Sequence, residues 1–156
     1  MAADDDLHSL ADEIGRMARA RGLAVATAES LTSGAIASGL GRGEGASEWF
    51  AGGVVAYAER VKRDVLGVTA TSVLTAQCAR ELATGVARLL DADVAVAVTG
   101  VGGPDAEEGL PPGTVYAALR VGDEVTDATW RFEGDPSSVV EQTVRAAIGL
   151  VRAALG

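Results

Sequence analysis

The chain has 156 residues, of which 48% are hydrophobic and 4% aromatic, and its formal net charge is −9. This length suits one ordinary domain, and we expect residues 1–156 to form it. Phosphate-directed binding of nucleic acid depends on clustered Lys and Arg, so the acidic balance argues against such a partner. The sequence has neither the long apolar run of a membrane helix nor a secretory signal pattern. It therefore predicts a cytoplasmic protein with no membrane partner.

Three residue types are scarce enough to restrict the chemistry. The chain has one histidine (His8), one cysteine (Cys78) and one lysine (Lys62), beside twelve arginines. A zinc site of the usual nitrogen and sulfur ligands is out of reach, and no metal or other cofactor is expected. Arginine keeps its proton in proteins, whereas a buried lysine can lose it and act as a base. Lys62 is thus a candidate base, with an ordinary surface cation as the alternative.

The spacing of apolar residues and of turn residues predicts an alternating order of elements. An amphipathic helix over 6–21 precedes a buried strand over 23–28, and Ser30 or Thr32 is placed to cap a helix over 31–40. The remaining expected elements are a strand over 53–58, helices over 59–66 and 72–90, a strand over 94–99, paired strands over 114–121 and 124–132, and a helix over 135–155. We expect one α/β domain with three layers, α/β/α, around a mixed, mostly parallel sheet.

Ligands of open α/β sheets collect at the carboxyl ends of strands, and three stretches of this chain fall there. They are residues 27–34, 57–62 and 99–105. The first is a strand-to-helix turn that could bind an anion such as a phosphate, although simple helix capping explains it equally. The third contains Gly100, Gly102 and Gly103 in a pattern that is also typical of a plain turn. Its acidic continuation could hold Mg²⁺ or be merely solvated.

A serine beside a neutral lysine is a known nucleophile and base pair. Ser47 precedes Lys62 by fifteen residues and follows a glycine-rich approach. This spacing permits the chain to return and place the hydroxyl beside the amine. We therefore predict that Ser47 and Lys62 lie in contact.

Five ordered blocks together resemble the CinA C-terminal domain family, the nicotinamide-nucleotide amidases, over nearly the whole chain. The matching blocks are TAESLTSG (27–34), GASEWF with GG (45–50 and 52–53), YAERVK with LGV (57–62 and 66–68), TGVGGPD (99–105) and PGTV (112–115). The resemblance implies hydrolysis of the carboxamide of nicotinamide mononucleotide, giving the nicotinate nucleotide and ammonia, without a metal. It also implies a homodimer.

Carried over residue by residue, the resemblance implies Ser47 as nucleophile, Lys62 as general base and Tyr57 as an orienting or proton-relaying residue. The substrate-binding residues expected from the motifs are Glu29, Ser30, Thr32, Thr99, Gly100, Gly102 and Gly103. The sequence departs from the family where Pro136 stands in place of a substrate-holding arginine and Glu59 in place of a neutral residue. These departures motivate two alternatives, a nucleotide-binding module without catalysis and a purely structural partner domain.

Overall fold

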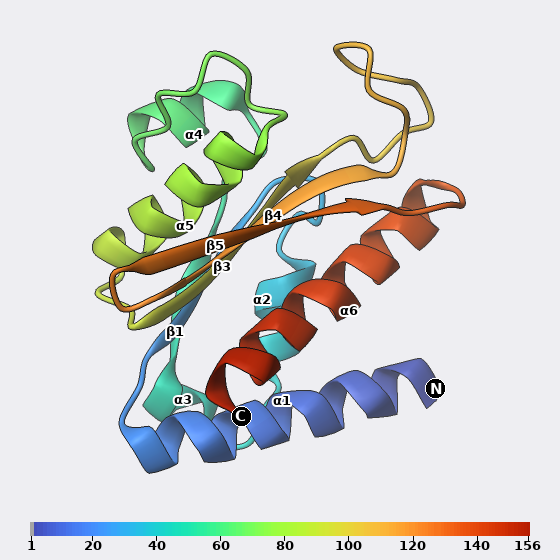
Figure 1. The fold of residues 1–156 in the computed structure, drawn as a ribbon. Coiled ribbons are helices and arrows are strands. Elements are labelled where there is room, and N and C mark those ends of the chain that lie inside the picture. The colour runs from blue at the N-terminus through green and yellow to red at the C-terminus, as the bar shows by residue number, and fades with distance from the viewer. Residues whose placement is uncertain (1) are drawn as a thin grey trace.

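The computed structural model describes residues 2–156 and contains six helices and five strands in this part of the chain (Figure 1). In chain order they are α1 (Ala2–Arg21), β1 (Val25–Glu29), α2 (Ala35–Gly41), α3 (Ala46–Trp49), β2 (Phe50–Val55), α4 (Glu59–Asp64), α5 (Ala76–Leu89), β3 (Val94–Gly100), β4 (Thr114–Val121), β5 (Glu124–Arg131) and α6 (Pro136–Leu155).

The strands form a single sheet in the order β2-β1-β3-β4-β5. β1 pairs in parallel with both β2 and β3, whereas β4 is antiparallel to its neighbours β3 and β5. Four strands therefore run in one direction and only β4 runs against them, which confirms the predicted mixed, mostly parallel sheet. None of the helices between residues 2 and 156 has the length and apolar character to span a membrane.

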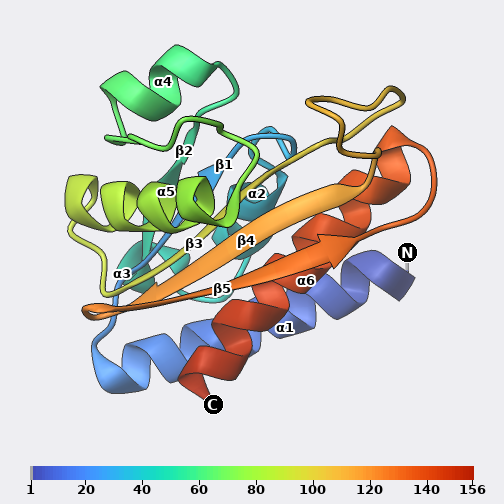
Figure 2. The ribbon, with the colours of Figure 1, turned by 45° about the horizontal axis from the view of Figure 1, so that its top comes forward.

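Two helical layers cover the sheet, as Figures 1 and 2 show. The helices α1, α2 and α6 pack on one face, while α5 lies on the other face with α4 beyond it. The sequence of β3 explains this sandwich, because its valines and alanines alternate. Val94, Val96 and Val98 enter the core with α1 and α6, whereas Ala95 and Ala97 enter the core with α5. Strand side chains alternate between the two faces of a sheet, so the larger valines fill the face covered by α1 and α6, and the small alanines lie on the face covered by α5.

The observed elements differ from the predicted ones around the first two strands and at the starts of two helices: α1 begins at Ala2 rather than at residue 6, and α5 begins at Ala76 rather than at residue 72 because Thr75 is its N-cap. Helix α2 begins at Ala35 rather than at residue 31, because residues 31–34 form a turn in which Ser33 (φ 52°) and Gly34 (φ 97°) adopt left-handed conformations. Strand β2 begins three residues earlier than expected and includes Gly53. A Cβ at Gly53 would collide with the Thr27 hydroxyl of β1, so the close approach of β1 and β2 requires glycine here.

Candidate active site

A cavity of about 420 Å³ opens where β1, β2 and β3 end. This volume lies within the range of small-molecule sites, and the position is the one where open α/β sheets bind ligands. The turn after β1, the segment leading into α4 and the β3–β4 loop surround it, and all three lie at the same end of the molecule (Figure 1). The lining residues are Ser30, Leu31, Tyr57, Glu59, Lys62, Val73, Leu74, Thr99, Gly100, Gly102, Gly103, Glu107, Glu108, Pro136 and Val140.

Lys62 lines this cavity and is nevertheless only 3% exposed. Its ammonium nitrogen donates to the main-chain carbonyl oxygen of Tyr57 at 3.0 Å. Burial lowers the pKa of Lys62 below its usual 10.5, while Cys78, Glu59 and Glu107 act in the opposite direction. Burial also raises the pKa of the Cys78 thiol to about 11, so this neighbour is a neutral thiol at pH 7. A lysine with a lowered pKa can supply a free amine to a reaction.

The floor of the cavity comes from the end of β3 and the loop that follows it. Thr99 is fully buried, and its hydroxyl donates to the carbonyl oxygen of Val73 at 2.8 Å. This bond holds the end of β3 against the segment before α5. The amides of Gly102 and Gly103 donate to no carbonyl of residues 2–156. A Cβ at Gly102 would meet no atom within 4 Å. The loop therefore leaves two backbone N–H groups beside the cavity without a carbonyl partner among residues 2–156.

Ser30 is the first residue after β1 and lies 8% exposed in the cavity wall. The preceding residue, Glu29, is turned away and does not line the cavity. Its carboxylate accepts hydrogen bonds from the Thr32 hydroxyl at 2.7 Å and from the amides of Ile36 and Ala37, both at 2.9 Å. These amides belong to the first turn of α2, so Glu29 caps this helix across the intervening turn.

This cap corrects three expectations drawn from the sequence. Neither Ser30 nor Thr32 caps α2, because the N-cap position is Gly34 and the capping carboxylate comes from Glu29. Glu29 and Thr32 contact each other rather than the cavity, so they are not placed to touch a ligand there. The helix terminus expected to bind phosphate already holds a carboxylate of the chain itself. A second anion would meet charge repulsion there.

The prediction that Ser47 lies beside Lys62 is wrong. Ser47 is an exposed residue of α3, directly before β2, whereas Lys62 follows β2 in α4. A six-residue strand rises about 3.3 Å per residue, so β2 alone carries the chain roughly 20 Å away from Ser47. Figure 1 shows α3 and α4 at opposite ends of the molecule. Among residues 2–156, the serine that lines the cavity with Lys62 is Ser30.

The remaining predicted site residues do gather in one place. Tyr57, Lys62, Thr99, Gly100, Gly102 and Gly103 all line the cavity with Ser30. Tyr57 contacts Lys62 through its main-chain carbonyl, while its side chain is 67% exposed at the rim. The sequence assigned Ser30 to binding only. A signal for placing Ser30 near Lys62 was nevertheless present. Ser30 follows β1 and Lys62 follows β2, and neighbouring parallel strands end at the same edge of a sheet.

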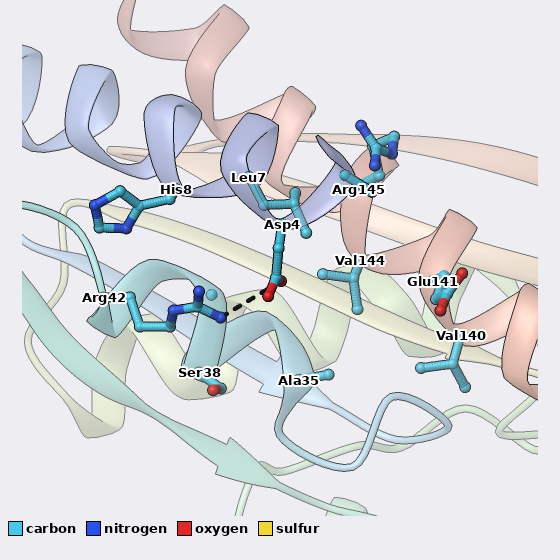
Figure 3. Close-up of a pocket in the computed structure, with 12 residues that line it drawn as sticks. Asp4, Leu7, His8, Ala35, Ser38, Arg42, Val140, Glu141, Val144 and Arg145 are labelled. Carbon is cyan, nitrogen blue, oxygen red and sulfur yellow. Dashed lines mark ion pairs between the residues drawn. The ribbon is translucent and has the colours of Figure 1, made fainter. Parts of the chain in front are cut away.

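A second cavity, of about 310 Å³, lies between α1, α2 and α6 (Figure 3). Its most prominent contact is an ion pair between Arg42 and Asp4, with 3.6 Å between the nitrogen and the oxygen. His8 and Arg145 also face it. Arg42 thus lies away from the candidate site and does not replace the arginine that is absent at Pro136. Pro136 itself lines the cavity that contains Lys62.

The fold and the cavity define this chain as an α/β domain with a cavity at the carboxyl edge of a mixed sheet. The sequence profile of the CinA C-terminal domain matches residues 7–155. The chain belongs to the CinA C-terminal domain family, as the five sequence blocks predicted.

Individual relatives agree with this assignment. The chain is 39% identical over 155 residues to a protein of Desulforamulus reducens named "Putative competence-damage inducible protein", with 96% of the chain and 38% of that protein covered. A Bacillus subtilis protein of the same name is 34% identical over 148 residues, with coverages of 92% and 36%. The chain therefore spans little more than a third of the length of these relatives.

Two solved structures have the same fold along their whole length. A protein of the competence-damaged protein (CinA) superfamily from Klebsiella pneumoniae superimposes with a TM-score of 0.91 at 35% identity, covering 96% of this chain and 97% of that one. A competence/damage inducible protein from Agrobacterium tumefaciens gives a TM-score of 0.88 at 34% identity, with coverages of 96% and 95%.

Proposed function

We propose that this domain is a serine amidohydrolase that cleaves the carboxamide of a nicotinamide nucleotide, with nicotinamide mononucleotide as the reference substrate. One observation carries the proposal: a buried lysine with a lowered pKa and a serine hydroxyl line one ligand-sized cavity at the carboxyl edge of the sheet. The family resemblance supports the choice of a carboxamide. In this proposal Ser30, and not Ser47, is the nucleophile.

The proposed reaction proceeds in two balanced steps. Neutral Lys62 accepts the proton of the Ser30 hydroxyl while its oxygen attacks the amide carbon. The lysine ammonium then gives this proton to the departing nitrogen, so that ammonia leaves and an ester to Ser30 remains. Water, deprotonated by the same amine, hydrolyses the ester and releases the carboxylic acid. The serine and the lysine return to their starting states.

The surrounding groups have supporting roles in this proposal. The free amides of Gly102 and Gly103 are suited to stabilise the oxyanion of the tetrahedral intermediate, an effect worth a few kcal/mol in acyl-transfer enzymes. The Tyr57 carbonyl keeps the Lys62 nitrogen at the cavity wall. Thr99 is a positioning residue, because its bond to Val73 fixes the end of β3.

Ammonia release by three variants tests the proposal. Ser30→Ala and Lys62→Met should each lower kcat by at least about 10³-fold, as expected when a member of a nucleophile and base pair is removed. Ser47→Ala is the matched control, because it removes the same hydroxyl at the other end of β2, and it should stay within about twofold of the wild type. Full activity of Ser30→Ala would overturn the proposal. Calorimetric binding of the nucleotide without ammonia release would instead support a binding module.

The homodimer and the cytoplasmic location stay predictions, which light scattering and cell fractionation can test.

A further inference from the structure

The side chains that line the cavity carry more negative charge than is expected of a site that binds a phosphate-bearing substrate. Three carboxylates, those of Glu59, Glu107 and Glu108, face it together with one basic side chain, that of Lys62. No arginine within residues 2–156 lines this cavity. Lys62 moreover has to be neutral to act as a base. The charge of the cavity in its reactive state is therefore set by the carboxylates.

Residues 2–156 neutralise only one of these carboxylates. Glu59 forms an ion pair with Arg63 at 2.8 Å. Glu108 accepts a hydrogen bond from the uncharged Ser72 hydroxyl at 2.8 Å. The Glu107 carboxylate has no cationic partner among residues 2–156 within salt-bridge distance. Two negative charges thus remain at the cavity without a counterion from the described chain.

The helix termini and arginines expected to receive a phosphate are occupied, distant or replaced by an apolar residue. Pro136 lines the cavity at the first position of α6, and Asp135 already accepts from the amide of Ser138 there at 2.8 Å. Arg63 is committed to Glu59 and to the carbonyl of Ala70 at 2.8 Å. Glu29 occupies the start of α2, and Arg42 lies in the second cavity (Figure 3). A phosphate in the cavity would meet carboxylates and, among the described lining residues, no guanidinium.

We propose that this cavity selects a cationic carboxamide without a phosphate, such as an N-ribosylated nicotinamide, over the corresponding 5′-phosphate. The inference rests on the proposed amidohydrolase function and names its substrate class. The ribosylated pyridinium ring carries one positive charge, which Glu107 and Glu108 attract. The exposed ring of Tyr57 at the rim offers a face for the same cation. The phosphate adds up to two negative charges and reverses the sign of the interaction.

The test compares kcat/KM for ammonia release from nicotinamide riboside and from nicotinamide mononucleotide, using the full chain. We expect the wild type to favour the riboside by at least about tenfold, which corresponds to one favourable charge interaction. Pro136→Arg places a guanidinium at the cavity and should raise kcat/KM for the mononucleotide by about 10- to 100-fold, as a charge-assisted bond to phosphate would. Ser137→Arg is the matched control. It adds the same charge at the next, exposed residue, outside the cavity lining, and should leave the ratio unchanged.

The outcomes separate this inference from the function on which it rests. Ammonia release with the mononucleotide preferred by the wild type would overturn the substrate preference and leave the amidohydrolase intact. Ammonia release from neither compound would overturn the amidohydrolase itself. The double substitution Glu107→Gln and Glu108→Gln, at two residues of an exposed loop, is a second test. It should lower the ratio of kcat/KM for the riboside to kcat/KM for the mononucleotide at least threefold. An unchanged ratio in that double variant would also overturn the preference, whether or not Pro136→Arg folds.

Discussion

The buried carboxylate of Glu29 offers a quantitative test of how the chain positions Ser30. Glu29 is 1% exposed and accepts four hydrogen bonds. Two come from amides of α2, at 2.9 Å each, and two from the hydroxyls of Thr32 and Thr27, at 2.7 and 3.4 Å. Ser30 directly follows Glu29 in the chain. These bonds therefore link the end of β1 to the start of α2, on either side of the turn that contains Ser30. We predict that Glu29→Gln destabilises the whole domain.

The expected magnitude follows from the geometry of these bonds. One amide donor reaches each carboxylate oxygen: Ile36 reaches Oε1 and Ala37 reaches Oε2. Glutamine keeps one oxygen and presents an NH₂ group at the other position, so one buried amide loses its acceptor at a cost of about 1–3 kcal/mol. The other bonds lose their charge assistance, which costs about 1–2 kcal/mol more. The free energy of unfolding should fall by about 2–5 kcal/mol, or roughly 4–20 °C in Tm for a chain of this size.

Denaturant unfolding followed by circular dichroism measures this change, and Glu81 supplies the matched control. Glu81 also accepts from two amides and one threonine hydroxyl, those of Thr69 and Ala70, at 2.6 to 3.0 Å. It differs from Glu29 in being partly exposed, so water can replace lost partners, and Glu81→Gln should cost only about 1 kcal/mol. Equal losses in the two variants, or a loss below about 1 kcal/mol for Glu29→Gln, would refute the assigned role of Glu29 as a buried cap.

The remaining predictions concern the titration of Lys62. Lys62→Met should raise the free energy of unfolding at pH 7 by about 1–3 kcal/mol, because it removes a buried ammonium. Since burial lowers the pKa of Lys62 in the folded state, the wild type gains stability as the pH rises from that pKa to the unfolded value of 10.5. The advantage of Lys62→Met should therefore vanish above pH 10.5, and an advantage independent of pH would contradict this explanation. Glu107→Gln should move the rising limb of the activity profile to lower pH, because Glu107 raises the pKa of Lys62. Glu124→Gln, at the exposed start of β5, should leave the limb in place.

Regular spacing made most of the fold predictable. The helix over 135–155, the strand pair over 114–121 and 124–132, and the buried strand over 94–99 all match observed elements to within a residue. Each has an unbroken period or a short turn, which are local signals. Helix α3 was not predicted because four residues are too short to show a helical period. The late start of α2 depends on Glu29, six residues before the helix begins, which caps the helix from beyond the usual N-cap position.

The site was predictable as a set of segments and not as a set of contacts. All three stretches expected at strand ends meet at the cavity. The pairing of Ser47 with Lys62 failed because sequence distance does not reveal direction: the strand between them carries the chain away without returning it. Glu29 and Arg63 bind backbone groups of Ile36 and Ala70, seven residues further along the chain and across turns that the sequence does not define. The sequence therefore could not show that these two side chains are already engaged, whereas the bond from Ser138 to Asp135 is a local helix cap.

The assignment of Ser30 as nucleophile is tested most directly by locating the acyl group. The wild-type protein can be quenched with acid during turnover of nicotinamide mononucleotide or nicotinamide riboside, digested, and mapped by mass spectrometry. We predict an ester of the N-ribosylated nicotinate on the peptide that contains Ser30, absent in Ser30→Ala and retained in Ser47→Ala. An ester on the Ser47 peptide would contradict the account, and so would ammonia release by Ser30→Ala at the wild-type rate.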